Sequence, residues 1–196
     1  MAAENLQELF VEELRDIYDA EKQLTKALPK MAKATENEGL RAAFEEHLDI
    51  TRMQVGRLEE VFKLLGMAAR GKTCEGMKGL IEEGQEAMEE MEGSTLDAAL
   101  IASAQKVEHY EIATYGTLAT FAEVLGMDDA KDLLGQTLEE EKEADEKLTM
   151  IASQINPEAE NEGEAEEEGS MAMAGRSSRG GNGGNRSRSN SRTKKR

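Results

Sequence analysis

Two acidic side chains fall on a helix face that should be buried. The segment from Leu96 to Val124 contains no proline, and its apolar residues recur at intervals of three and four, which predicts an amphipathic helix. Glu108 and Glu111 lie on the same face as these apolar residues. A buried carboxylate without a partner costs free energy, so it either raises its pKa or binds a cation. A divalent metal ion between helices would supply that charge.

Other segments with the same periodicity carry polar residues on their apolar faces, near the middle of each segment. These residues are Glu21, His47, Glu141 and Asp145. In an antiparallel bundle the midpoints of the helices come to one level, so these side chains would converge with the first two. Carboxylates and an imidazole suit two iron ions, or manganese, and carboxylates can bridge them.

A plainer interpretation competes with the metal site. A third of the residues are charged, and a glutamate on a helix is usually solvated, as we expect for Glu139, Glu140, Glu143 and Glu146. A single inward histidine is more often a hydrogen-bonded core residue than a ligand. In the metal-binding interpretation, hydrogen-bond donors lie near the ligands and orient them. By their positions along the helices, these donors are Tyr18, Gln54 and Tyr115, and the two tyrosines are predicted to tune the reactivity of the centre.

Long helices joined by short turns would position these residues. Alanine, glutamate, leucine, lysine and methionine abound and only two prolines occur, which predicts an all-α fold. We expect long helices at residues 4–36, 40–65, 96–125 and 128–154, and a short helix at 75–91. Pro29 is expected to bend or break the first helix, and Gly66 to end the second in a left-handed conformation. Two antiparallel pairs joined by one crossover, which carries the short helix, form a ferritin-like four-helix bundle.

The composition changes at Pro157, which separates a helical domain, residues 1–156, from a tail, residues 157–196. The tail holds seven glutamates within residues 158–168 and is then rich in glycine, serine, asparagine and arginine. Neither part has enough apolar surface to offset its ordering entropy, so we expect a disordered acidic-then-basic tail. The formal charge of −17 argues against nucleic-acid binding except through the basic segment 176–196; alternatively the tail only solubilises the protein or self-associates.

The remaining features exclude several classes of protein. No apolar run approaches the roughly 20 residues that a membrane-spanning helix needs. The first residues lack the basic and apolar regions of a signal peptide, so we expect a cytoplasmic protein without a membrane partner. The single cysteine, Cys74, excludes an internal disulfide. Motifs of a nucleophile elbow, a phosphate-binding loop or a cysteine zinc site are absent from the sequence.

Several segments resemble the YciE/YciF family of ferritin-like proteins. They are 16–24, 44–51, 79–83, 138–142 and 98–120, the last with the specific run Gln-Lys-Val-Glu-His-Tyr-Glu-Ile-Ala. The resemblance covers residues 4 to about 154 and implies a ferritin-like fold, a homodimer, a di-iron centre and a role in stress responses. By position, it implies a ligand set of Glu21, His47, Glu108, Glu111 and Glu141, with Asp145 as a further candidate. The chain departs from related patterns at Phe44, where an acid would precede the histidine, and at Ile50, where family members often have an acid.

Two functions from different classes fit these observations. The first is a ferroxidase-type oxidoreductase that oxidises two Fe(II) ions with peroxide or dioxygen, with Glu108 and Glu141 bridging the ions. The second is a non-catalytic dimeric stress scaffold that acts through its charged tail. A ferritin-like storage shell is a third alternative.

Overall fold

The structure is a computed structural model that describes residues 3–177, and for residues 162–177 it describes the backbone alone. Its helices are α1 (Leu6–Ala34), α2 (Glu38–Leu64), α3 (Glu75–Glu90), α4 (Gly93–Val124) and α5 (Asp128–Ser177). The chain divides into two units, Met1–Glu160 and Asn161–Arg196. The first unit holds α1 to α4 and α5 as far as Glu160.

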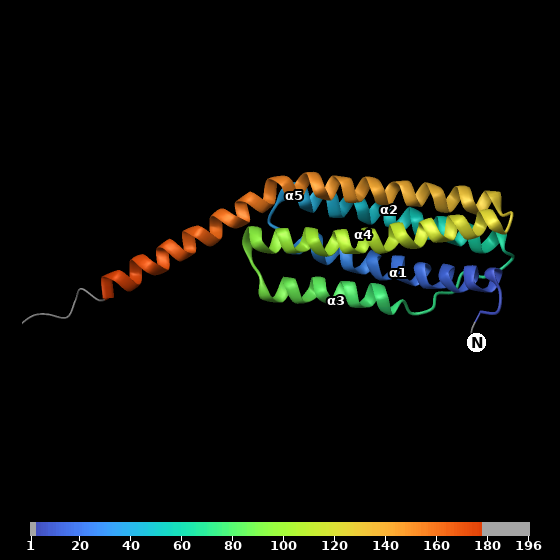
Figure 1. Cartoon of the computed structure of the whole chain (residues 1–196), viewed down its shortest axis with the longest axis horizontal. Coiled ribbons are helices and arrows are strands. Elements are labelled where there is room, and N and C mark those ends of the chain that lie inside the picture. The colour runs from blue at the N-terminus through green and yellow to red at the C-terminus, as the bar shows by residue number, and fades with distance from the viewer. Residues whose placement is uncertain (1–2, 178–196) are drawn as a thin grey trace, which may run out of the picture. The chain divides into compact units, whose positions relative to one another are not determined.

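Within the first unit, the four long helices lie lengthwise beside one another (Figure 1). Short turns join α1 to α2 and α4 to α5, while a long connection that contains α3 joins the two pairs. Helix α3 packs against α1 and α4. This is the predicted ferritin-like arrangement, two antiparallel pairs and one crossover, so the all-α fold is confirmed.

The ends of the helices follow from local chemistry. Asn5 and Asn37 cap the first two helices by accepting hydrogen bonds from the backbone N–H groups three residues later. Gly66 and Gly126 follow α2 and α4 with φ of 67° and 70°, a conformation that glycine adopts without a steric cost. The left-handed conformation predicted for Gly66 is therefore present. The predicted break at Pro29 does not occur, because α1 continues through it.

The end of α5 also differs from the sequence prediction. We expected this helix to stop near residue 154, but the structure continues it through Pro157 to Ser177. The glutamates and alanines that follow Pro157 are strong helix formers, which favours continuation past the proline. Residues 157–177 of the predicted tail thus belong to α5, and the disorder of the tail stays a prediction. The rest of the predicted tail, with most of its basic segment, lies outside the described residues.

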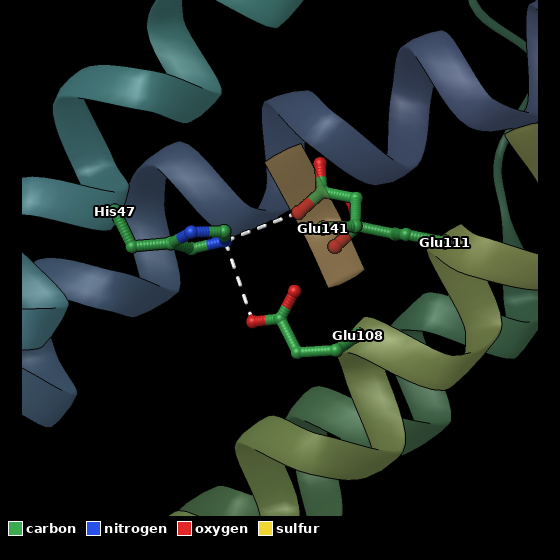
Figure 2. Close-up of side chains that lie close together, drawn as sticks. All are labelled: His47, Glu108, Glu111 and Glu141. Carbon is green, nitrogen blue, oxygen red and sulfur yellow. Dashed lines mark ion pairs between the residues drawn. The ribbon is translucent and has the colours of Figure 1, made fainter. Parts of the chain in front are cut away.

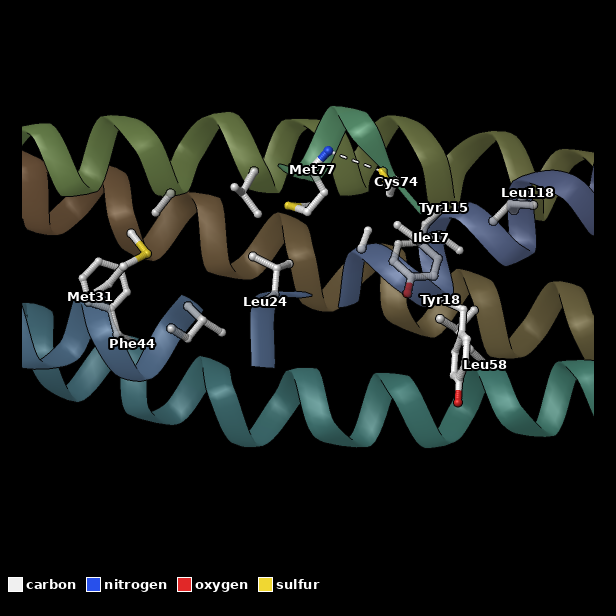
Figure 3. Close-up of a cluster of buried hydrophobic side chains, with 14 of the residues drawn as sticks. Ile17, Tyr18, Leu24, Met31, Phe44, Leu58, Cys74, Met77, Tyr115 and Leu118 are labelled. Atoms are coloured by element: carbon white, nitrogen blue, oxygen red, sulfur yellow. Dashed lines mark hydrogen bonds between the residues drawn. The ribbon is translucent and has the colours of Figure 1, made fainter. Parts of the chain in front are cut away.

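Apolar layers hold the long helices together on either side of their middle. Figure 3 shows part of this core, with Ile17 and Leu24 of α1, Leu58 of α2 and Leu118 of α4 among its side chains. These four side chains are at most 2% exposed, and each contributes about 1.5–3 kcal/mol by leaving water. The core therefore fixes the depth at which polar residues near mid-helix are buried. Within residues 3–177, no helix has the length and apolar character needed to cross a membrane.

Candidate metal centre

Three of the long helices bring one imidazole and three carboxylates together. We call this group the His/Glu cluster; its members are His47 of α2, Glu108 and Glu111 of α4, and Glu141 of α5 (Figure 2). All four residues are buried, and one ligand atom from each lies within 4.8 Å of the others. His47 Nε2 is 3.4 Å from Glu108 Oε1 and 3.8 Å from Glu141 Oε2. Oxygen and nitrogen atoms at this spacing could surround a metal ion.

The cluster contains polar atoms that the protein leaves without partners. Among the described residues, neither oxygen of Glu111 has a hydrogen-bond donor, and the same holds for Glu108 Oε2. His47 Nδ1 is also buried without a partner. Buried polar atoms in native proteins are nearly always hydrogen-bonded, so a group of orphans calls for an explanation. A bound cation would fit, because carboxylate oxygens and neutral imidazole are its natural ligands.

Burial sets the protonation of the cluster. It raises the pKa of Glu108 to about 8. It also raises the pKa values of Glu111 and Glu141 well above the usual range, and the neighbouring carboxylates push both further up. Burial lowers the pKa of His47 to about 4, and the charge of Lys147 adds to this effect. At neutral pH the metal-free cluster therefore keeps protons on its carboxyl groups and has a neutral imidazole, and a metal ion would displace those protons.

Glu21 lies beside the cluster as a further buried carboxyl group. It comes from α1, is fully buried, and accepts a hydrogen bond from the hydroxyl of Tyr115. Burial and the charge of Glu141 raise the pKa of Glu21 well above its usual range, and Glu21 in turn raises the pKa of Glu111. The structure thus places Glu21 and Tyr115 next to the cluster, although Glu21 is not among its four grouped ligands.

Two other predicted site residues have partners outside the cluster. The hydroxyl of Tyr18 points towards α2 (Figure 3) and donates to Glu59 Oε1 at 2.8 Å. Asp145 is partly exposed, accepts a hydrogen bond from Gln105 Nε2 at 3.1 Å, and has Oδ2 3.5 Å from His109 Nε2. The structure therefore gives both side chains partners of their own outside the cluster.

An ion pair next to the cluster was missed in the sequence. Arg57 donates to both carboxylate oxygens of Glu140, each at 2.8 Å, and joins α2 to α5. The buried amide of Gln54 donates to the same carboxylate at 3.2 Å. We expected Glu140 to be solvated, which is wrong, because this pair holds it partly buried. Arg57 lies three residues after Gln54 and thus on the same helix face, but nothing in the sequence pairs it with Glu140 of another helix.

Comparisons with known proteins support the arrangement. A family model described as a domain of unknown function, DUF892, matches residues 5–160. Protein YciF of Escherichia coli (strain K12) is 50% identical over 164 residues, which cover 82% of this chain and 99% of YciF. The crystal structure of this E. coli stress protein superposes with a TM-score of 0.77 at 49% identity, over 79% of this chain and 99% of that one.

Two further solved structures are similar. YcfI from Rhodopseudomonas palustris has a TM-score of 0.73 at 48% identity, over 74% of this chain and 94% of its own. A Xanthomonas campestris protein has a TM-score of 0.65 at 20% identity, over 82% of this chain and 99% of its own. At this identity the likeness shows the fold alone. From the family match and the identity to YciF, this chain belongs to the YciE/YciF family, described as DUF892.

Proposed function

We propose that this protein acts in stress responses by binding Fe(II) at the His/Glu cluster and oxidising it with peroxide or dioxygen. One observation carries the proposal: three carboxyl groups and an imidazole lie buried within 4.8 Å of one another. Five of their six oxygens, on Glu108, Glu111 and Glu141, have no hydrogen-bond partner among the described residues. A role in stress is supported by the similarity to YciF, whose crystal structure describes it as a stress protein.

The side chains of the cluster suit iron as a substrate. His47 offers a neutral nitrogen at pH 7 because burial lowers its pKa to about 4. The carboxyl groups release their protons as Fe(II) arrives, and the resulting negative charges favour Fe(III) over Fe(II). In this scheme Glu108, Glu141, His47 and Glu111 would together hold the iron, with the carboxylates supplying negative charge and the imidazole a neutral nitrogen.

Glu21 extends this ligand set on the α1 side. The hydroxyl of Tyr115 holds one of its oxygens, and the other oxygen has no partner among the described residues. Tyr115 therefore orients Glu21 so that its free oxygen could serve a second ion. An oxygen-rich set with one imidazole suits iron or manganese better than soft metals, because no thiolate takes part.

The test measures both binding and oxidation. Wild-type protein is loaded with Fe(II) without oxygen, its metal content is determined, and air or hydrogen peroxide is then added while near-ultraviolet absorbance records ferric iron. We expect stoichiometric iron and oxidation faster than in buffer. The Glu108→Ala, Glu141→Ala double variant should lose both properties. A Glu139→Ala, Glu146→Ala variant, with both changes at exposed positions of α5, serves as the matched control.

Iron that is bound only weakly by the wild type, or oxidised at the rate of buffer, would refute the proposal. Manganese is loaded in parallel, since its retention without oxidation would identify a different resident metal. We also propose a homodimer, as the family resemblance implies. Light scattering distinguishes a dimer from the many-subunit shell of a storage protein.

A further inference from the structure

A pocket of about 360 Å³ adjoins the His/Glu cluster. Residues of α1, α2, α4 and α5 line it, and two cluster members, His47 and Glu108, form part of its wall. Its volume lies within the range of about 300–1,000 Å³ that is usual for small-molecule sites. The pocket therefore gives a small molecule access to the ligand atoms of the cluster.

The walls of this pocket are mostly apolar. The apolar side chains come from all four helices and include Leu28, Phe44, Ile50, Ala104, Ala144 and Leu148. Hydrogen peroxide gains little from such walls, because it is polar and has no organic group to bury. An alkyl or aryl group gains roughly 25 cal/mol for each Å² of apolar surface that it removes from water. The lining thus favours a molecule with an apolar body.

The polar residues of the lining limit the charge of that molecule. Apart from the cluster members, they are Glu46, Glu140, Glu143 and Lys147. Lys147 forms an ion pair with Glu46, and Glu140 is paired with Arg57. These pairs leave the charge of Glu143 uncompensated, so the lining is net negative and repels carboxylates and phosphates. A neutral ligand avoids this repulsion.

We propose that the pocket binds the organic group of a small neutral hydroperoxide, ROOH, which serves as the oxidant of the iron centre. The O–O bond then lies at the His47 and Glu108 end of the pocket. The inference rests on the proposed iron oxidation and specifies its oxidant. Breaking the O–O bond takes two electrons from two Fe(II) ions and two protons from solvent: ROOH + 2 Fe(II) + 2 H⁺ gives ROH, H₂O and 2 Fe(III).

The first experiment measures binding without iron. The probe is 2-phenyl-2-propanol, which keeps the organic group of cumene hydroperoxide but has no O–O bond, titrated into metal-free protein and followed by NMR. Ala144→Phe fills the pocket from a half-buried position and should weaken binding at least about tenfold, or about 1.4 kcal/mol. Ala152→Phe, also half-buried on α5 but outside the lining, should leave binding unchanged.

A second variant tests the pocket independently, in case Ala144→Phe does not fold. Ile50→Asn places an amide in the wall without filling the pocket, and it should also weaken binding of the alcohol. Circular dichroism confirms that each variant is folded. If the alcohol does not bind to the wild type, or binds equally to all folded variants, the proposal is overturned even when iron oxidation proceeds.

The second experiment compares oxidants on iron-loaded protein by stopped-flow absorbance. Ala144→Phe should slow oxidation by cumene hydroperoxide at least about tenfold, and oxidation by hydrogen peroxide less than about twofold. Equal slowing with both oxidants would overturn the proposal and make the pocket a general entrance. If neither oxidant reacts with the wild type while the alcohol still binds, then the iron oxidation and the oxidant role fail together, and the pocket is an organic-ligand site of another kind.

Discussion

A partly buried polar group and a fully buried one lie on neighbouring faces of α4, and they differ in how their atoms are paired. Around Tyr110, the phenol donates to Asp16 Oδ2 at 2.6 Å and lies 3.0 Å from Cys74 Sγ. The backbone N–H of Cys74 donates to Asp19 Oδ2 at 2.9 Å. One residue further along, Glu111 belongs to the His/Glu cluster, and neither of its oxygens has a donor among the described residues.

The difference is the one expected between a structural group and the proposed binding site. The group around Tyr110 links the start of α3 to α1 and α4, and its hydrogen bonds offset the cost of burying its polar atoms. The His/Glu cluster contains similar carboxyl groups, but its orphaned atoms must be compensated by protons or by a cation. Residue type therefore does not distinguish the two groups, whereas the count of partners does.

The largest expected effect comes from removing one charge of the cluster. Glu111→Gln should weaken Fe(II) binding by about a hundredfold or more, since changing even the partners of metal ligands typically costs 10–100-fold. The stability of the metal-free protein should stay within about 1 kcal/mol, because the lost carboxylate has no protein partner. Calorimetric titration with Fe(II) under nitrogen and urea unfolding measure the two quantities.

Asp145→Asn is the matched control for that variant. The sequence predicts Asp145 as a ligand, but the structure gives it Gln105 and His109 as partners. Its replacement should change the affinity for Fe(II) by less than about threefold, roughly 0.7 kcal/mol. A loss as large as that of Glu111→Gln would place Asp145 inside the site after all.

The group around Tyr110 should respond in the opposite way. Asp19→Ala leaves the N–H of Cys74 without its acceptor and removes a hydrogen bond of 2.7 Å from Gln23. We expect a loss of about 1–3 kcal/mol in the free energy of unfolding, with Fe(II) binding unchanged. Urea denaturation of the chelator-treated protein checks the first result. A variant that keeps its stability but loses iron would reverse the assigned roles.

The pH dependence of stability gives a further test of the buried carboxyl groups in the His/Glu cluster. The folded state raises the pKa of Glu108 from 4.5 to about 8, so the folded protein holds this proton more tightly, and its contribution to stability falls as the pH rises through 8. Folding lowers the pKa of His47 from 6.5 to about 4, so this residue makes stability rise with pH, but only below pH 6.5. Metal-free protein should therefore lose stability between pH 6.5 and 8, by up to about 1.4 kcal/mol per pH unit for each proton. Urea unfolding with a chelator tests this, and Glu108→Gln should flatten the slope.

The smallest effect should follow from shortening the chain. The family match ends at residue 160, where the first unit also ends. Removing residues 161–196 should leave the rate of iron oxidation within about twofold, or 0.4 kcal/mol, of the full chain. If the protein is instead a scaffold that acts through its charged tail, the shortened chain loses a partner or an assembly, which size measurement and pull-down would detect.

Periodicity in the sequence predicted the helices and the shared level of Glu108, Glu111 and Glu141. It did so because the spacing of apolar residues fixes which face of a helix is buried. It failed for Tyr18, since a buried face is about 100° wide and spacing does not say which neighbour a side chain meets. Here the ring packs edge-on against Phe62, which directs the hydroxyl to Glu59.

Two other differences between the sequence predictions and the structure have similar origins. Glu140 was expected to face water because it is next in sequence to the inward Glu141, and nothing local reveals Arg57 on another helix. Pro157 was taken as the end of α5, although a proline in a helix competes with the helix propensity of the residues around it. Long-range pairing and the balance of local preferences both require coordinates.

The two hydrogen bonds between Arg57 and Glu140 have a consequence for how fast a metal ion could bind. Because two parallel hydrogen bonds tie α2 to α5 beside the His/Glu cluster, the protein itself holds the spacing between His47 of α2 and Glu141 of α5. Metal binding would then require little rearrangement of the backbone, so little of the binding free energy would be lost to ordering it. If the protein binds iron as we propose, the rate of capture would then be limited by how fast iron diffuses to the cluster.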